Sequence, residues 1–342
     1  MRNKQYNNCI SDLKKYGNSS LSYLTLSKKL SVFRSKKWNG YFAYKEFFNS
    51  VIILGNPVVP KESIKEAVDD LLKTFSKNKK HLGFFLCSEE VANILKKKGF
   101  KTYFFGKEAV INPKKFNISG KKGWSIRSSV NYARRNKMIV EEYKCSKKRN
   151  LKLEDEINEI SNEWRIRKKN PELDFAFGHV NFNDYKNIRY FICKQKRKVV
   201  GFINIYPIYR INSYYLDLTR HGNNSPRGTI DFLYYECIKK LEQEGIEKIY
   251  IGLSPLSFLK SYNNEHNQNY IKIMIIFHPL LELIYPFKSE FFYKKKFATD
   301  WESNYVCFYP RISIRTLFSL LHSVYEGGFA GIFIYKIKSF FK

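Results

Sequence analysis

The stretch that decides the fold runs from Tyr215 to Ser257 and reads YLDLTRHGNNSPRGTIDFLYYECIKKLEQEGIEKIYIGLSPLS. An apolar strand is followed by a loop rich in Gly, Pro and Asn, then by an amphipathic helix and a second strand. Backbone N–H groups at the start of such a helix point toward the loop, and the helix dipole favours negative charge there. The loop region also carries Arg220, His221 and Arg227. This stretch therefore predicts a site that holds a phosphate group.

The chain as a whole is basic. Its 342 residues contain 61 Lys and Arg against 31 Asp and Glu, a formal net charge of +30. The length suffices for two domains or one large one, and a hydrophobic content of 44% is enough for a packed core. This charge predicts polyanionic partners, either nucleic acid or an anionic membrane. A bias toward Lys, Asn, Ile, Tyr and Phe, as in AT-rich genomes, is the alternative explanation for part of it.

Residues that usually bind metals are scattered. The six cysteines show no CxxC spacing and the six histidines no HExxH pattern, so we expect no metal site and no disulfide framework. A GxSxG elbow and the Walker A and GxGxxG loops are also missing. Free thiols and an N-terminus without an apolar signal segment favour a cytoplasmic location. For the apolar segment Tyr270–Phe287, which Lys272 and Pro279 interrupt, we expect a buried strand and turn or a segment resting on a membrane.

Two α/β units follow one another along the chain, in residues 1–115 and 116–342. In the first, strands are predicted at 41–47, 51–54, 81–87, 101–105 and 109–111, and helices at 61–76 and 89–98. In the second, helices are predicted within 120–137 and at 153–168, and strands at 138–143, 189–195 and 198–209; the opening stretch, a short basic helix and a strand at 304–309 follow. The tail, 316–341, reads as a docking helix pair or an interfacial anchor.

The order of elements in the second unit is that of a GCN5-related N-acetyltransferase (GNAT) fold. We therefore predict the α/β class, with tandem GNAT-like units whose mixed central sheets are flanked by helices. Enzymes of that fold usually hold the pyrophosphate of coenzyme A with a Q/R-x-x-G-x-G/A loop at the helix start. The equivalent loop here, RHGNNSPRGT (220–229), lacks that spacing. A phosphate-bearing ligand other than acetyl-CoA is predicted.

Several segments match one family in order and spacing. The most specific are VGFINIYPIY (200–209), DLTRHGNNSPRGTIDF (217–232), IGLSPLS (251–257) and YKKKFATDWESNY (293–305). With them, the chain resembles the catalytic domain of the phosphatidylglycerol lysyltransferases, the multiple peptide resistance factors. The resemblance implies transfer of an amino acid, lysine or similar, from aminoacyl-tRNA to a hydroxyl of phosphatidylglycerol, with the active site in the second unit. Family members often carry a membrane-spanning flippase region, so lipid translocation is expected to lie outside this chain.

Elementary chemistry agrees with such a reaction. Exchange of one ester for another is nearly isoenergetic, so the catalyst has mainly to align two substrates and stabilise a tetrahedral oxyanion. We therefore expect no metal and no redox cofactor. Both substrates, aminoacyl-tRNA and an anionic phospholipid, are attracted by a strongly basic chain. The expected location is cytoplasmic and peripheral, at the inner face of the cell membrane.

Arg220 and Arg227, with the helix start near Gly228, are the candidates for binding a phosphate of the lipid headgroup or of the tRNA 3′ end. Asp231, on the first helical turn, could hold the aminoacyl ammonium; the alternative is a carboxylate placed there only because the helix dipole favours it. Lys296 is the remaining residue of the predicted catalytic set, which is Asp217, Arg220, Asp231 and Lys296.

Asp217 lies between apolar neighbours on a strand, where an unpaired carboxylate is costly. It is therefore expected to pair with a cation or to line the cleft, where it is the candidate general base. Side chains alternate along a strand, so Asp217 and Arg220 should face opposite sides. They can share one site only if the strand bulges or ends before Arg220.

Further residues are predicted to contact the substrates. Lys294 and Lys296 could stabilise the oxyanion or grip phosphate, or simply be solvated. Trp301 is expected in the core or as a stacking platform for a base, and Glu302 as a group that recognises a side-chain amine. The complete predicted binding set is Asn204, Arg227, Gly228, Gly252, Ser254, Lys294, Trp301 and Glu302, with Asn204 facing the cleft. Arg127, Asn131 and Arg134 share one helical face and are predicted to contact tRNA or membrane, the alternative being a solvated stripe.

Two other functions stay open at the level of the sequence. One uses the same aminoacyl-tRNA donor with a small-molecule or peptide acceptor. The other is a non-catalytic protein that binds tRNA or membrane through its charge. Loss of transfer with retention of tRNA binding, after substitution of Asp231 or Arg220 by Ala, would separate the enzymes from the binding protein.

Overall fold

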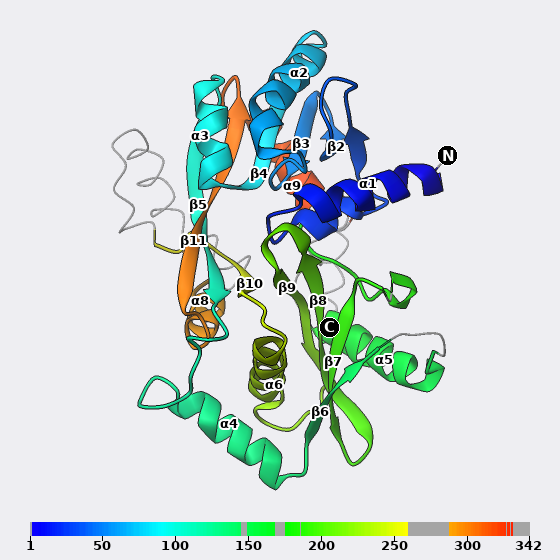
Figure 1. Cartoon of the computed structure of the whole chain (residues 1–342), viewed down its shortest axis with the longest axis vertical. Coiled ribbons are helices and arrows are strands. Elements are labelled where there is room, and N and C mark those ends of the chain that lie inside the picture. The colour runs from blue at the N-terminus through cyan, green and yellow to red at the C-terminus, as the bar shows by residue number, and fades with distance from the viewer. Residues whose placement is uncertain are drawn as a thin grey trace.

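The computed structural model describes residues 2–144, 149–167, 175–184, 186–258 and 287–325, together with 327, 328 and 330. Their strands form one mixed 11-stranded sheet in the order β1-β2-β3-β4-β11-β5-β10-β9-β8-β7-β6 (Figure 1). The predicted segment Tyr270–Phe287 lies outside the described residues except for Phe287. Within the described ranges, no helix is long and apolar enough to cross a membrane.

In the N-terminal part, the structure confirms the strands and helices predicted from residue 41 onward and adds three elements before it that were not predicted. The elements are α1 (Arg2–Tyr16), the 3-10 helix η1 (Ser22–Leu26), β1 (Ser31–Phe33), β2 (Phe42–Phe47), β3 (Ser50–Leu54), α2 (Ile64–Ser76), β4 (His81–Ser88), α3 (Glu89–Lys97) and β5 (Lys101–Ile111). One difference is β5, which is a single strand of 11 residues where two short pieces were predicted. Pairing with β10 and β11 along its length keeps it continuous.

The second half also has the predicted elements. They are α4 (Trp124–Arg135), β6 (Ile139–Tyr143), α5 (Leu151–Arg167), β7 (Arg189–Gln195), β8 (Lys198–Ile208), β9 (Ser213–His221), α6 (Thr229–Gln243), β10 (Lys248–Pro255), α8 (Phe287–Lys295), β11 (Asp300–Tyr309) and α9 (Ile314–Val324). Strand β11 begins earlier than the predicted residue 304. The tail prediction is met in part, because α9 docks on the sheet; most of residues 326–341 lie outside the described part of the chain.

The topology joins the two predicted sheets into one. Strand β11, from the second half of the sequence, is inserted between β4 and β5 and pairs antiparallel with both. Strand β10 then links β5 to β9, antiparallel to the former and parallel to the latter. The sheet is continuous across the predicted boundary, because β11 from residues 116–342 pairs with two strands from residues 1–115. The division of the chain into units 1–115 and 116–342 stays a prediction.

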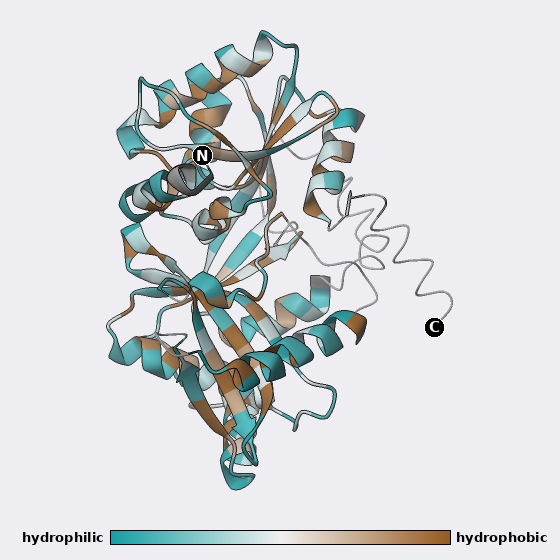
Figure 2. Ribbon diagram, turned by 90° about the vertical axis from the view of Figure 1, so that its right-hand side faces the viewer, coloured by the Kyte–Doolittle hydropathy of each residue, from teal (hydrophilic) through white to brown (hydrophobic). Residues whose placement is uncertain are grey.

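Three apolar clusters hold the layers together. Helices α2 and α3 cover one face of the sheet in the first half, around Leu71, Phe84 and Leu95. Helices α4 and α6 cover one face in the second half, around Ile126 and Leu233. Helices α1, α5 and α9 pack on a further cluster that continues from one half to the other. Figure 2 shows brown, apolar bands along the strands and mixed colouring on the helices, as this layering requires.

Candidate active site

A β-bulge shapes the centre of the candidate site. Strands β8 and β9 are in register at Ile203↔Thr219 and again at Ile205↔Leu216, so Asp217 and Leu218 together face Asn204. The Oδ1 of Asn204, which is fully buried, accepts a hydrogen bond of 2.7 Å from the backbone N–H of Leu218. The side-chain amide thus replaces the missing partner in the strand ladder. It also makes Asn204 part of the polar group around Asp217.

Asp217 is held in a tight polar pocket. Its Oδ2 accepts a hydrogen bond of 2.9 Å from the backbone N–H of Gly178, and the Tyr206 hydroxyl also bonds to this carboxylate. A Cβ on Gly178 would lie 1.9 Å from the Tyr206 oxygen, so only glycine allows this approach. Tyr206 in turn stacks on Tyr23 of η1 with 4.8 Å between ring centroids. The second half of the chain and the N-terminal segment therefore build this pocket together.

The electrostatics of Asp217 are unusual for a carboxylate. Its Oδ1 is shielded from solvent and has no hydrogen-bond partner among the described residues. Burial raises the pKa of Asp217 to about 7, although the bonds from Gly178 and Tyr206 and the charge of Arg220 act in the opposite direction. A carboxylate in this state can accept a proton near neutral pH.

Arg220 faces the same side of the sheet as Asp217. Strand β9 continues to His221, so the strand does not end before Arg220; the bulge is what brings the two side chains to one face. Arg220 is only 4% exposed, donates to the Oγ of Ser161 and lies over the ring of Trp164 at 4.6 Å, both on α5. The structure therefore separates Arg220 from the start of α6, where a joint phosphate site with Arg227 and Gly228 was predicted.

The predicted residues at the start of α6 form a second polar group, on the face of the sheet opposite Asp217 and Arg220. Asp231 is 8% exposed, and its Oδ2 accepts a hydrogen bond of 2.8 Å from Ser129 of α4. Its Oδ1 accepts one of 3.1 Å from Tyr293 of α8, and Lys296 lies 3.7 Å from Oδ2. Asp231 and Lys296, two members of the predicted catalytic set, thus lie together, while Asp217 and Arg220 lie on the opposite face; the catalytic role of all four stays a prediction. The carboxylate of Asp231 already serves to join α4, α6 and α8.

The loop before α6 is closely packed. Gly228 has φ of +79°, and a Cβ there would lie 2.8 Å from the Cβ of Ser129. Arg227 is exposed beside it. Helix α4 therefore covers one side of the start of α6. Arg227 is the cationic side chain of this loop that is exposed to solvent.

Strands β9 and β10 separate after a short parallel pairing, and the predicted residues of IGLSPLS lie where they part. The pairing covers Lys248↔Ser213 to Tyr250↔Tyr215, and β10 then continues on β5 across a bulge. Gly252, at φ +88°, faces Lys294, whose Nζ would lie 3.5 Å from a Cβ at this position. Lys294 is 9% exposed and donates a bond of 2.6 Å to the carbonyl of Leu253.

Ser254, the other predicted residue of this segment, is fully buried. Its Oγ makes no hydrogen bond within the described part of the chain. The two predicted residues of the segment therefore differ, because Gly252 lies beside a cation and Ser254 lies in the interior.

Two carboxylates face each other beside this point, and one of them escaped the sequence analysis. Glu108 of β5 pairs directly with Glu302 of β11, and both approach the hydroxyl of Tyr250. Glu108 is 6% exposed and accepts a bond of 2.9 Å from Ser20; burial, with a smaller contribution from Glu302, raises its pKa to about 7. Glu302 is more exposed and pairs with Lys248 at 2.8 Å. An acidic residue inside the apolar run FGKEAVI was the available signal for Glu108.

The remaining predicted residues have more ordinary surroundings. Trp301 packs against Phe258 and Phe291 with centroid distances of 5.2 and 5.3 Å, an aromatic cluster on α8. Arg127 donates to the carbonyls of Ile118 and Gly120, and Arg134 pairs with Glu236 of α6 at 3.2 Å. Asn131 is exposed. The predicted stripe on α4 is therefore partly engaged in holding the fold.

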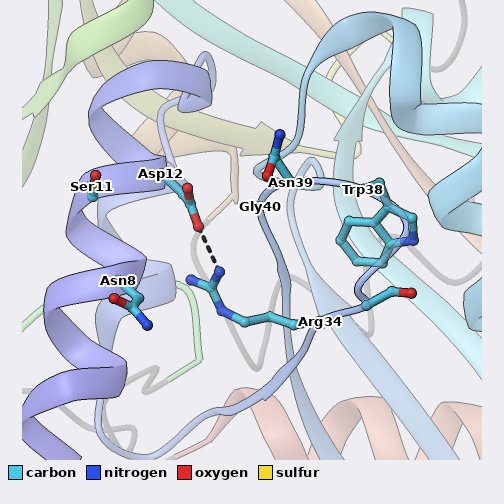
Figure 3. A pocket seen from close by; sticks show the side chains of 8 residues that line it. Asn8, Ser11, Asp12, Arg34, Trp38, Asn39 and Gly40 are labelled. Carbon is cyan, nitrogen blue, oxygen red and sulfur yellow. Dashed lines mark hydrogen bonds and ion pairs between the residues drawn. The ribbon is translucent and has the colours of Figure 1, made fainter.

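A separate polar pocket lies between α1 and the segment that leads into β2 (Figure 3). It has a volume of about 230 Å³ and contains none of the predicted site residues. The guanidinium of Arg34 reaches across it to Asp12 at 2.6 Å, which Figure 3 marks with a dashed line. Within this lining, the two charges of Arg34 and Asp12 compensate each other.

Residues 10–308 match the family model described as phosphatidylglycerol lysyltransferase, C-terminal. The phosphatidylglycerol lysyltransferase of Bacillus subtilis is 21% identical over 300 residues, which is 86% of this chain and 34% of the relative. That of Staphylococcus haemolyticus is 22% identical over 301 residues, 88% of this chain and 35% of the relative. The chain thus spans about a third of the length of these curated relatives.

Solved structures show the same fold. The structure of L-PGS from Bacillus licheniformis has a TM-score of 0.78 at 21% identity, covering 94% of this chain and 97% of that one. The C-terminal domain of a putative lysylphosphatidylglycerol synthetase from Agrobacterium fabrum gives 0.78 at 19% identity, with 96% and 98% covered. FemX gives 0.55 at 11%, with 92% and 98% covered. The predicted fold class and the predicted resemblance are confirmed, and the chain belongs to the family of the phosphatidylglycerol lysyltransferase C-terminal domain.

Proposed function

We propose that the chain transfers an amino acid, lysine or similar, from aminoacyl-tRNA to a hydroxyl of phosphatidylglycerol. The observation that carries this proposal is the family match over residues 10–308, which includes every residue discussed above as a candidate for catalysis. Relatives that share the domain are named phosphatidylglycerol lysyltransferase. The net charge of +30 suits two anionic substrates. Peripheral association with the inner face of the membrane follows from the acceptor.

Asp217 is the proposed general base. Its shielded Oδ1 and its pKa near 7 suit removal of a proton from a hydroxyl at neutral pH. The acceptor oxygen attacks the ester carbonyl carbon of the aminoacyl group as its proton passes to Asp217. The tetrahedral intermediate then collapses, the bond to the ribose oxygen breaks, and the proton moves to that leaving oxygen. Gly178 and Tyr206 hold the carboxylate in place throughout.

Cationic side chains are proposed to carry the negative charge of the intermediate and of the phosphates. Lys294 is the candidate for the oxyanion, because it is nearly buried at the point where β9 and β10 separate. Arg220 is proposed to bind a phosphate on the face of the sheet that α5 covers. Arg227 and Lys296 are proposed to contact phosphate on the face of α4 and α8.

Carboxylates are proposed to recognise the amines of the donor. Glu302 and Glu108 face each other on the neighbouring strands β11 and β5. Lys248 pairs with Glu302 and the charge of Lys294 acts on Glu108, and an incoming ammonium is proposed to add to this compensation. A lysyl side chain has such a group. Asp231 was the predicted ligand of the α-ammonium, but it lies on the face opposite Asp217 and is engaged by Ser129, Tyr293 and Lys296. It is therefore proposed to join α4, α6 and α8 and not to contact the reacting aminoacyl group.

The test is a transfer assay with labelled lysyl-tRNA and vesicles that contain phosphatidylglycerol. We expect label to appear in the lipid fraction, to depend on intact tRNA, and to fall by about 10² or more with Asp217→Asn. Asp300→Asn, an exposed carboxylate on β11, is the matched control. Label transferred to water-soluble acceptors in place of lipid would favour the alternative acceptor. Binding of tRNA without any transfer would overturn the enzymatic proposal.

A further inference from the structure

The strand register brings three connections to one end of the sheet. Phe47 of β2 pairs with Ser50 of β3, Ser50 pairs with His81 of β4, and Leu82 pairs with Tyr309 of β11. The β2–β3 turn, the α2–β4 turn and the segment between β11 and α9 therefore lie side by side. This is the upper end of the molecule in Figure 1, where the arrow of β11 finishes.

The β2–β3 turn exposes a large aromatic residue. Phe48 is 72% exposed, more than any other large apolar residue in the described part of the chain. Its φ of +47° lies in the left-handed region, where Gly or Asn is favoured in a tight turn. Its ring contacts that of Phe47, with 4.3 Å between the centroids, but most of its surface stays exposed to solvent.

Helix α9 is fixed beside this turn. The ring of Phe47 stacks on His322 at 3.5 Å between centroids, and the Oγ of Ser319 donates a bond of 3.0 Å to the carbonyl of Phe47. The Nζ of Lys45 also donates to the carbonyl of Ser323 at 3.0 Å. Phe48 and α9 therefore belong to one surface.

Helix α9 packs Leu320 and Val324 against the apolar core and also exposes apolar side chains on its outer face. Its most buried side chains are small and polar: Thr316, Ser319 and Ser323 are 0, 0 and 1% exposed. Leu317 and Phe318 point outward and are 41% and 48% exposed. The small residues let the helix approach the strand backbone closely, and Leu317 and Phe318 remain on the outside with Phe48.

Basic residues surround these apolar groups. The amide of Asn49 donates a bond of 2.7 Å to the carbonyl of Lys79, which ties the β2–β3 turn to the lysine-rich α2–β4 turn. The nearby acid Glu46 is paired with Lys80. The exposed cations at this end of the sheet are Lys77, Lys79, Lys101, Arg311 and Arg315. Together with Phe48, Leu317 and Phe318 they are called the tip surface below.

We propose that the tip surface docks onto an anionic phospholipid bilayer, with the apolar side chains entering the interface and the cations meeting the headgroups. Exposed apolar groups rimmed by Lys and Arg match both parts of such a surface. A nucleic acid would match the cations but not Leu317. A second copy of the chain would bring the same positive charge against itself. The inference rests on the proposed function for its lipid acceptor, although the tip surface lies apart from Asp217.

Cosedimentation with vesicles tests this directly. Vesicles of phosphatidylglycerol and phosphatidylcholine should bind the wild-type chain, and the double variant Phe48→Ser/Leu317→Ser should bind about tenfold or more weakly. Ile166→Ser is the matched control, because Ile166 is 67% exposed on α5 and lies outside the tip surface. Vesicles of phosphatidylcholine alone should bind weakly to all variants. Equal binding of the double variant and the wild type would overturn the proposal.

A second measurement covers the case in which the double variant does not fold. Phe48→Trp keeps an aromatic group at the turn, and its added emission should be quenched by brominated phosphatidylglycerol in vesicles. No quenching beyond that of the wild type would contradict insertion. A wild-type dimer that the double variant abolishes, with vesicle binding unchanged, would assign the surface to self-association and also overturn the proposal.

Failure of membrane docking can be distinguished from failure of the proposed transfer reaction. With phosphatidylglycerol dispersed in detergent, the double variant should transfer lysine as the wild type does, because no bilayer has to be reached. Vesicle binding that depends on Phe48 without any lysyl transfer would support docking and reject the proposed reaction. Transfer to lipid without a role for Phe48 in vesicle binding would support the proposed reaction and reject docking through the tip surface.

Discussion

The Oδ1 of Asn204 accepts a hydrogen bond of 2.7 Å from the backbone N–H of Leu218, at the position where β8 and β9 lose their regular register. The amide thereby stabilises a bulge that turns Asp217 to the same face as Arg220. A fully buried asparagine inside an apolar strand costs free energy unless it is hydrogen-bonded. Here that bond shapes the proposed site.

Replacement of Asn204 by Leu should therefore destabilise the fold and misplace Asp217. The N–H of Leu218 would be left buried without its partner, at a cost of about 1–3 kcal/mol. Urea unfolding measures the loss, and Asn131→Leu on the exposed surface of α4 should change stability by no more than about 0.5 kcal/mol. An unchanged urea midpoint for Asn204→Leu would show that the bulge does not need this side chain.

Gly178→Ala should impair transfer through Tyr206 and Asp217. The new Cβ would lie 1.9 Å from the Tyr206 oxygen and 2.6 Å from Oδ2 of Asp217, so one of them must move. We expect a loss of about 1–3 kcal/mol in stability and a fall in kcat. Adding Tyr206→Phe should restore part of the stability because it removes the closest atom. Gly222→Ala, whose Cβ would have no contact shorter than 3.2 Å, is the control; an equal effect at both glycines would contradict this account.

Stability should fall as pH rises from about 5 to about 7.5. The pKa values of Asp217 and Glu108 are raised to about 7 from the usual 3.8 and 4.5, so between these values the folded state binds more protons than the unfolded state. The free energy of unfolding then decreases with pH until both groups are ionised. Measured by urea unfolding, this slope should flatten in the double variant Asp217→Asn/Glu108→Gln.

The loss of stability expected at lower pH has a different origin. Asp70, Glu154 and Glu244 have pKa values lowered by their hydrogen-bond donors, and the stability they contribute is lost only as pH falls through the lowered values. Between pH 5 and 7.5, His322 acts in the opposite direction, because burial and the charge of Lys45 lower its pKa. The difference in slope between the wild type and the double variant therefore isolates Asp217 and Glu108. An identical slope for wild type and double variant in that window would show that Asp217 and Glu108 titrate normally.

Glu302→Gln should change which amino acid is transferred. If Glu302 and Glu108 bind the lysyl ammonium, loss of one charge should lower kcat/KM for lysyl-tRNA by about tenfold or more and leave that for alanyl-tRNA nearly unchanged. Competition between the two charged tRNAs measures the ratio. Glu247→Gln, an exposed carboxylate in the turn between α6 and β10, is the control. An equal loss for both donors would place Glu302 outside the specificity pocket.

Local patterns in the sequence predicted most of the secondary structure because helices and strands here follow their own periodicity. The helix from Ile64 and the strand from His81 begin within a few residues of the predicted positions. The motifs also located Asp217 and Asp231 within a candidate site. The motifs also select Lys296, but only the tertiary structure places it beside Asp231, because 65 positions of the chain separate the two residues.

Contacts between distant segments were beyond the sequence. Glu108 was missed because its importance arises from Glu302, which becomes its neighbour only when β11 inserts beside β5. Gly178 likewise reaches Asp217, and Tyr23 reaches its neighbour Tyr206, from other parts of the chain. The separation of Arg220 from Arg227 depends on which face each element presents to the sheet.

The sequence by itself determined the alternating strands and helices, the basic character of the chain and the family to which its motifs belong, because periodicity, charge and motif spacing are local properties. Only the tertiary structure decided that the two predicted sheets join into one, that a bulge places Asp217 beside Arg220, and that α9 presents Leu317 outward. These features depend on strand register and burial, which are set by packing between segments far apart in the chain.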